Sequence, residues 1–171
     1  MARKLCTIGF AGKTAEEFFR LLEGAGVRTV IDVRENRVGQ LSGYAKFPDI
    51  AFFLERVAGI GYRHEPLLAP TPEIRKRYRE TKDWAGYEQS FLELMRARGF
   101  PGNYSLDGEQ PVAFLCSEPG AERCHRRLVV ELLAARGREQ GEVAEIEHLV
   151  AEKARGKGKG KRRGNGGTDP E

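Results

Sequence analysis

Short apolar runs alternate along this chain with segments of helical periodicity, and this alternation limits the folds that the sequence can adopt. The runs at 5–10 (LCTIGF), 29–33 (TVIDV) and 112–116 (VAFLC) are rich in residues that favour β-strands. Their hydrophobicity is continuous rather than alternating, which is typical of strands in a parallel sheet that is covered on both faces. Two shorter strands are expected at 61–66 and 143–149.

Helical segments lie between these strands, and most of them begin at a capping residue or a proline and end at a glycine. They are expected at 14–24, 48–59, 71–82, 83–99 and about 124–137. The order of strands and helices predicts a single α/β domain of three layers, Rossmann-like or flavodoxin-like. Its sheet is expected to be open and mostly parallel, with helices on both faces.

The 171 residues are predicted to form one domain over 1–150 and a disordered basic tail of Gly, Lys and Arg over 151–171. The tail accounts for the formal net charge of +4, because 153–171 contain seven basic and two acidic residues. The rest of the chain is nearly neutral, with 22 basic and 23 acidic residues. The segment KARGKGKGKRRGNGG has no apolar residue larger than alanine, so it cannot bury enough surface to fold.

The sequence predicts a cytoplasmic protein without a membrane partner. No run approaches the roughly 18 apolar residues of a membrane span. The first residues contain no long apolar stretch followed by a cleavage site, so a secretory signal is not expected. The chain has an odd number of cysteines, Cys6, Cys116 and Cys124, which are expected to be reduced thiols.

Polar residues follow the second and fourth predicted strands at the point where each strand ends. Asp32 and Arg34 end one strand, and Cys116 and Glu118 end the other. Ligands of open α/β sheets bind outside the carboxyl ends of the strands. These two pairs are therefore expected to lie at one shared site.

The predicted helix that begins near Cys124 adds His125 and Arg126 to the same site. A helix start presents unpaired amide groups and the positive end of the helix dipole, which favours anions. We therefore expect Arg34, His125 and Arg126 to bind an anion, with Cys116 beside them.

The same residues also have purely structural interpretations. Asp32 and Arg34 can form an ion pair that only holds the strand end. Cys116 lies on an apolar strand, and Cys124 aligns with Leu128 on the core-facing side of its helix, so both thiols can be inert core residues.

The motifs resemble those of the family called domain of unknown function 488. Its hallmarks are an Asp-Val-Arg segment and a Cys-x-Glu followed by Cys-His-Arg, which stand here at 32–34, 116–118 and 124–126. The resemblance covers about 4–150, with the motifs in the same order. At 67–71 this chain has Leu-Leu-Ala-Pro-Thr in place of the Leu-Gly-Gly turn of many relatives. The resemblance implies that these motifs form a site, but it implies no particular reaction or cofactor.

Three functions are compatible with these residues. The first is an enzyme that acts on an anionic substrate, phosphate-bearing, nucleotide or nucleic acid, in a Cys-x-Glu/Cys-His-Arg pocket. Cys116 would be the nucleophile, Glu118 a general acid or base, and Asp32 a third catalytic residue. The second is a metal-binding protein with Cys116, Cys124 and His125 as candidate ligands.

The third function is non-catalytic binding of nucleic acid through the basic tail, which would hold phosphate groups without sequence specificity. The tail residues concerned are Lys157, Lys159, Lys161, Arg162 and Arg163. The basic helix expected at 71–82 is a further candidate surface, and its alternative interpretation is a solvated charged face. The cofactor and the oligomeric state are not indicated by the sequence.

Overall fold

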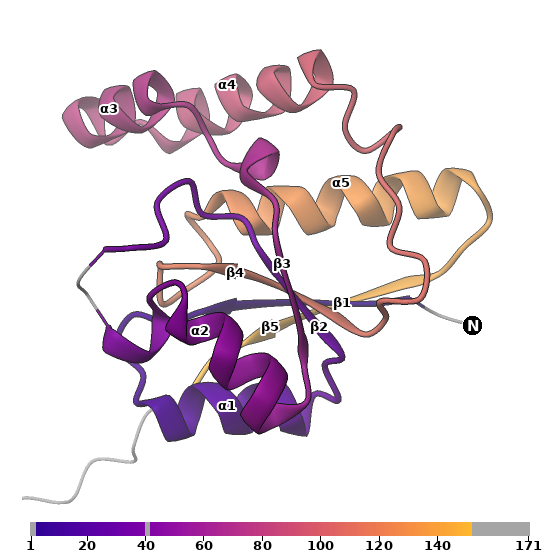
Figure 1. The fold of residues 1–171 in the computed structure, drawn as a ribbon. Coiled ribbons are helices and arrows are strands. Elements are labelled where there is room, and N and C mark those ends of the chain that lie inside the picture. Colours follow the sequence, from indigo (N-terminus) through magenta and orange to yellow (C-terminus); the bar gives the residue numbers. More distant parts are fainter. Residues whose placement is uncertain (1–2, 40–41, 152–171) are drawn as a thin grey trace, which may run out of the picture.

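The sheet of this protein consists of five parallel strands in the order β3-β2-β4-β1-β5 (Figure 1). The structure is a computed structural model that describes residues 3–39 and 42–151. The strands are β1 (Arg3–Gly9), β2 (Thr29–Asp32), β3 (Gly61–His64), β4 (Val112–Cys116) and β5 (Ala144–Leu149). The predicted α/β fold with a parallel sheet is confirmed.

Helices cover both faces of the sheet, as predicted, and give the domain its three layers (Figure 1). The helices are α1 (Ala15–Gly24), α2 (Asp49–Phe52), α3 (Pro72–Thr81), α4 (Trp84–Ala97) and α5 (His125–Glu139). Helix α2 continues as a π-helical segment over Phe53–Ala58. Helices α1 and α2 lie on one face, while α5 covers the other and α3 and α4 lie above it on the same side.

Successive residues of each central strand contribute to two different cores, which explains why the strands are apolar throughout. Val30 and Leu115 belong to the core under α1 and α2. Ile31 and Phe114 belong to the core shared with α4 and α5. All five residues of β4 are buried, because this strand is central and both of its faces are covered.

Two of the predicted helix starts are confirmed by their hydrogen bonds. The Thr14 hydroxyl accepts from the Glu17 amide at 3.1 Å, and the Thr14 amide donates to the Glu17 carboxylate at 2.8 Å. Asp83 caps α4 by accepting from the Gly86 amide at 3.0 Å. The third strand is shorter than predicted, because Pro66 has no amide hydrogen and begins the 3-10 turn η3 (Pro66–Leu68) instead.

The topology places a switch point between β2 and β4. After β2 the chain leads to β3, its neighbour on one side, and after β4 it passes over β1 to β5 on the other side. Crevices at such points are where open α/β sheets bind ligands. The two polar strand ends predicted from the sequence therefore meet at a position that suits a functional site.

Two sequence-based predictions concern segments rather than the sheet. The described part of the chain contains no helix with the length and apolar character needed to cross a membrane. The basic tail predicted for 151–171 lies outside the described residues, apart from Ala151.

Candidate functional site

A cavity of about 460 Å³ lies at the carboxyl ends of β2 and β4. Its wall comes from segments that are distant in sequence: the ends of β1 and β2, the turn before α3, helix α3, the start of α4 and the loop between β4 and α5. Five predicted site residues line it: Arg34, Cys116, Glu118, Cys124 and His125. Asp32 and Arg126 are not among the lining residues.

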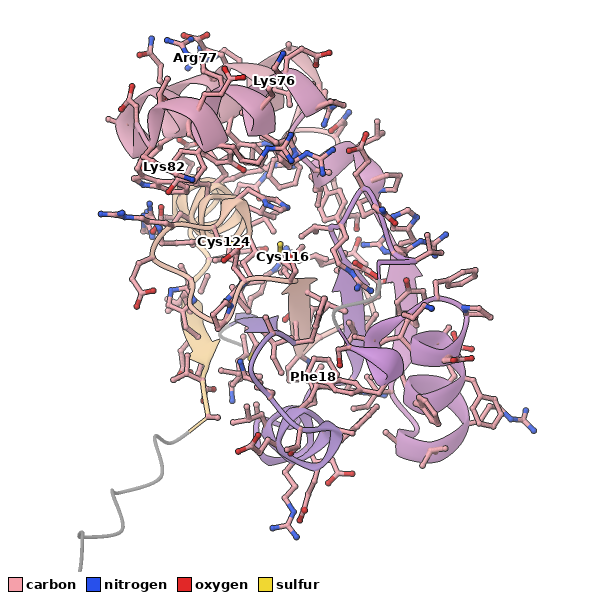
Figure 2. All side chains as sticks on the ribbon, turned by 90° about the vertical axis from the view of Figure 1, so that its left-hand side faces the viewer. Phe18, Lys76, Arg77, Lys82, Cys116 and Cys124 are labelled. Carbon is pink, nitrogen blue, oxygen red and sulfur yellow. The ribbon has the colours of Figure 1, made fainter. Side chains whose placement is uncertain are left out.

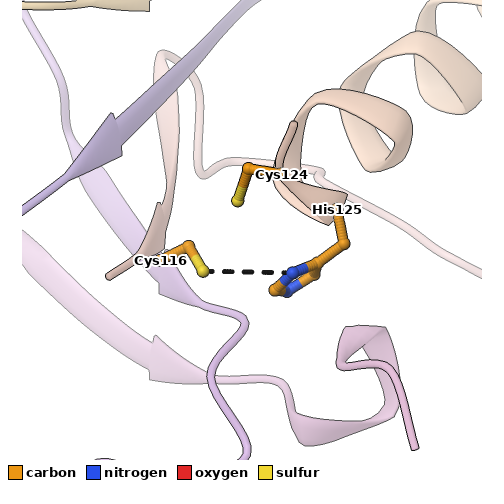
Figure 3. Close-up of side chains that lie close together, drawn as sticks. All are labelled: Cys116, Cys124 and His125. Carbon is orange, nitrogen blue, oxygen red and sulfur yellow. Dashed lines mark hydrogen bonds between the residues drawn. The ribbon is translucent and has the colours of Figure 1, made fainter. Parts of the chain in front are cut away.

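Cys116 and His125 form a close pair at the base of this cavity. Cys116 ends β4, His125 begins α5, and both are buried. The His125 Nε2 atom lies 3.1 Å from the Val33 carbonyl oxygen. Because a carbonyl only accepts, Nε2 carries the proton in this arrangement and the neutral ring presents an unprotonated Nδ1. That nitrogen lies 3.9 Å from the Cys116 sulfur, where it can accept the thiol proton (Figure 3).

Cys124 completes a cluster with this pair. It is the N-cap residue of α5, and one ligand atom from each of Cys116, Cys124 and His125 lies within 4.8 Å of the other two (Figure 3). A hydrogen bond with Cys124 lowers the pKa of the Cys116 thiol well below its ordinary value, and His125 and Arg126 help it to outweigh burial. The same hydrogen bond, with burial, raises the pKa of the Cys124 thiol. Of the two thiols, Cys116 is therefore the one that loses its proton more readily.

Arg126 lies behind the cluster and fixes the loop between β4 and α5. Its side chain is 1% exposed. One terminal nitrogen donates to the Glu118 carbonyl oxygen at 2.7 Å and lies 3.3 Å from the Cys124 sulfur. No carboxylate pairs with it among residues 3–39 and 42–151. A buried cation without a counter-ion is costly, and a thiolate in the cluster would compensate its charge.

Gly9 was not predicted as a site residue, although the conformation of the loop depends on it. It lies beside Cys116 in the sheet, and a Cβ atom at position 9 would be 1.6 Å from the Glu118 carbonyl oxygen. Only glycine leaves room for this carbonyl, which Arg126 holds from the other side. The Glu118 side chain itself is exposed and lines the cavity.

Asp32 is fully buried and its carboxylate is saturated with hydrogen bonds. It accepts from the Arg34 amide at 3.1 Å, from the Arg34 guanidinium at 2.8 and 2.7 Å, and from the Tyr62 hydroxyl at 2.8 Å. Burial alone would lower the pKa of Arg34, but its hydrogen bonds with Asp32 raise it instead. Burial and the charge of Asp32 raise the pKa of Tyr62 to about 12. Asp32 does not line the cavity, but it holds the Arg34 side chain, which does.

The cavity wall also contains a group of basic side chains that was not predicted as part of the site: Arg75, Arg79, Lys82 and Arg123. Three of them come from the 71–82 segment, which had been expected to be either a nucleic-acid surface or a solvated face. Their spacing of four and three residues indicates one side of a helix and could have identified them. Lys76 and Arg77 lie on the outer side of the same helix, away from the labelled cysteines (Figure 2). The acidic lining residues are Glu35, which pairs with Arg75, and Glu118.

Aromatic side chains of α3 and α4 form another part of the wall. Trp84 stacks on Tyr87 with ring centres 4.9 Å apart. Tyr87 is parallel to Phe91, whose ring lies 5.6 Å from that of His125. This row of rings runs from the cavity wall to His125 in the cysteine cluster.

The cluster also has the donor set of a metal site. Two thiolates and an imidazole suit zinc. A ligating histidine usually donates its other ring N–H to a carbonyl or carboxylate, as His125 does to Val33. The structure thus brings together the three metal candidates predicted from the sequence, Cys116, Cys124 and His125.

The fold and the site define the class of this protein: a single-domain, parallel α/β protein with a Cys-Cys-His cluster at the carboxyl edge of its sheet. Residues 14–133 match the family model described as Domain of unknown function DUF488. The chain therefore belongs to this family, as its motifs indicated. No significant match was found among curated proteins or solved structures.

Proposed function

We propose that this protein is an enzyme in which Cys116 acts as a nucleophile on an anionic substrate. The observation that carries the proposal is the position of His125, whose Nδ1 faces the Cys116 sulfur while Val33 holds its Nε2. His125 takes the thiol proton, and the charges of the resulting imidazolium and of Arg126 stabilise the Cys116 thiolate. The sulfur then bonds to an electrophilic atom of the substrate, and the imidazolium returns the proton to the departing group.

The basic lining of the cavity supports an anionic substrate. Arg34, Arg79, Lys82 and Arg123 line the same cavity as Cys116, and together they give it a positive potential. A cavity of about 460 Å³ is within the range that holds a small molecule, such as a nucleotide or another phosphate ester.

The remaining predicted residues receive distinct roles in this proposal. Asp32 is a positioning residue, because it contacts only Arg34 and Tyr62 through its carboxylate. Arg126 is a positioning residue for the loop and a counter-charge for the sulfurs. Glu118 stays the candidate general acid or base, since its exposed side chain lines the cavity and can activate the water that releases a covalent intermediate.

Alkylation by iodoacetamide at a series of pH values tests the nucleophile. Because the pKa of Cys116 is lowered, its thiolate should persist at pH values below the ordinary thiol pKa of about 8.5. Burial raises the pKa of Cys6 to about 11, so Cys6 serves as the internal reference. We expect Cys116 to be modified at least about tenfold faster than Cys6 at pH 7, as measured by peptide mass spectrometry. Equally slow modification of all three thiols would contradict the proposal.

Two further measurements separate the base from the anion site. His125→Gln keeps an amide near the Nε2 position that can donate to the Val33 carbonyl but cannot take a proton, so the pH midpoint of Cys116 alkylation should rise. Pyrophosphate should protect Cys116 in the wild type and protect it less in Arg79→Gln, whose alkylation without pyrophosphate should stay unchanged. Full protection in Arg79→Gln would remove this residue from the anion site.

A metal centre is the second candidate function, because the cluster provides three ligand atoms within 4.8 Å at the edge of the cavity. Elemental analysis of protein purified without chelator should then find close to one zinc or iron per chain. Chelation should release the metal and speed up the alkylation of Cys116, since a bound metal occupies its sulfur. Substoichiometric metal in every preparation would exclude this function.

A further inference from the structure

We infer that Cys116 and Cys124 form a redox pair, in which a hydroperoxide oxidises Cys116 and Cys124 converts the product into a disulfide. The inference rests on the proposed reactivity of Cys116 and extends the site to a second reactive sulfur. Both thiols are free, both line the cavity, and their sulfur atoms lie within 4.8 Å of each other.

The position of Cys124 suits a residue that attacks its neighbour. Cys124 is the N-cap of α5, yet its side chain makes no capping hydrogen bond, so helix α5 does not depend on its present orientation. Its backbone is extended, with φ −138° and ψ 138°, at the end of the short 117–123 loop. A disulfide needs the sulfurs about 2.05 Å apart. Closing the gap between the sulfurs would require a movement of Cys124 and of the last residues of this loop, beyond the part that Gly9 and Arg126 hold at Glu118.

Each sulfur has a partner that fits its step in the reaction. Cys116 faces His125 at 3.9 Å, and Cys124 lies 3.3 Å from the Arg126 guanidinium. His125 can supply the proton that a departing oxygen needs. Arg126 can stabilise the negative charge when Cys124 loses its own proton.

The proposed oxidation proceeds in two balanced steps. In the first step, the Cys116 thiolate attacks one oxygen of the hydroperoxide and the O–O bond breaks. The departing oxygen takes a proton from the His125 imidazolium. The products are a sulfenic acid on Cys116 and an alcohol or water. The Cys124 thiolate then attacks the Cys116 sulfur, and the hydroxyl group leaves as water with the proton from Cys124. The two thiols supply the two electrons, and an external dithiol restores them.

Cys6 provides a matched control within the same chain. It is fully buried on β1, in the core under α1 and α2, whereas Cys116 and Cys124 belong to the core on the opposite face of the sheet. Sulfur chemistry that depends on the cluster should therefore leave Cys6 unchanged.

The experiment treats the full-length protein with hydrogen peroxide and follows it by intact and peptide mass spectrometry. The wild type should lose two hydrogen atoms of mass and yield a Cys116–Cys124 linked peptide, and dithiothreitol should reverse both changes. Cys6→Ser should behave like the wild type. Cys124→Ser should form no disulfide and should instead accumulate Cys116 sulfenic acid, which dimedone traps.

The outcomes separate this inference from the proposed function. Cys6 lies in the core on the other face of the sheet, so Cys116 should keep its fast alkylation by iodoacetamide in Cys6→Ser. Fast alkylation of wild-type Cys116 without any Cys116–Cys124 disulfide after peroxide would overturn the redox pair and leave the nucleophile intact. A disulfide that involves Cys6 would overturn it as well. Slow alkylation of Cys116 would contradict the proposed function itself.

Discussion

At the scale of single residues, the buried Asp32–Arg34 pair shows how one ion pair prepares a site. The carboxylate of Asp32 accepts three hydrogen bonds from Arg34 and one from Tyr62, and it is inaccessible to solvent. Both the structural and the functional interpretation of this pair are compatible with its geometry. The pair holds the end of β2, and it also fixes a guanidinium in the cavity wall.

Replacing Asp32 by Asn should therefore be strongly destabilising. The change leaves the buried guanidinium of Arg34 without its counter-ion, and breaking a buried pair in this way costs about 3–5 kcal/mol. The free energy of unfolding in urea measures the loss. The control is Glu16→Gln, which breaks the exposed Glu16–Arg20 pair on α1 and should cost about 0.5 kcal/mol or less. Similar losses in the two variants would show that the Asp32 pair is no more important than a surface contact.

The residue types of the cluster could be predicted from the sequence, but their partners could not. Cys116, Cys124 and His125 were identified as one site because strand ends and helix starts meet in such folds. The carbonyl of Val33, which determines the proton position on His125, is a backbone group without a side-chain signature. The burial of Arg126 could not be predicted either, because arginine at a helix start is usually exposed.

At the scale of secondary structure elements, the close contact between β1 and the loop after β4 determines the shape of the site. Backbone hydrogen bonds from Phe10 and Ala11 to Cys116 and Ser117 extend the strand pairing into this loop. Gly9 allows the Glu118 carbonyl to approach, and Arg126 holds it there. The loop that joins Cys116 to Cys124 is therefore held by β1, the strand beside it.

Replacing Gly9 by Ala should displace this loop. The added Cβ collides with the Glu118 carbonyl, and overpacking of this kind costs about 1–3 kcal/mol. The alkylation rate of Cys116 at pH 7 should fall as the sulfur moves away from His125. Gly24→Ala is the control, because a Cβ there meets no atom within 4 Å, and it should stabilise α1 by about 0.5–1 kcal/mol. An unchanged alkylation rate in Gly9→Ala would mean that the loop does not position Cys116.

The positions of strands and helices along the chain could be predicted from the sequence more completely than the order of the strands in the sheet. Continuous apolar runs identify β4, and a capping box identifies α1, because these signals are local. The placement of β4 between β1 and β2 depends on contacts between distant segments, and no local pattern encodes it. The spacing of Arg75, Arg79 and Lys82 indicates that they share one side of the 71–82 segment, but only the fold shows that this side faces the cavity.

At the scale of the whole molecule, the charge is divided between the domain and the end of the chain. Five basic and two acidic residues of the domain line the cavity, although residues 1–152 as a whole are nearly neutral. Residues 153–171 carry seven basic and two acidic side chains, and they lie outside the described residues. Binding of a small anion in the cavity and binding of a long polyanion by residues 153–171 are thus two separate predictions.

Removing residues 153–171 should abolish weak, sequence-independent binding of nucleic acid. The expected reason is the loss of counter-ion release, since all of the excess positive charge is removed and the remaining residues carry a formal net charge of −1. Electrophoretic mobility of DNA and RNA at low salt measures the binding, and the alkylation rate of Cys116 in the same variant should stay unchanged. Retained affinity would direct attention to Lys76 and Arg77 on the outer side of α3.

The aromatic row beside the cavity has a practical consequence. The chain contains one tryptophan, and Trp84 lines the cavity while it stacks on Tyr87. Indole fluorescence from the intact protein therefore originates at the wall of the site and nowhere else. A compound that enters the site changes the surroundings of this ring, so its emission reports occupancy without any attached label.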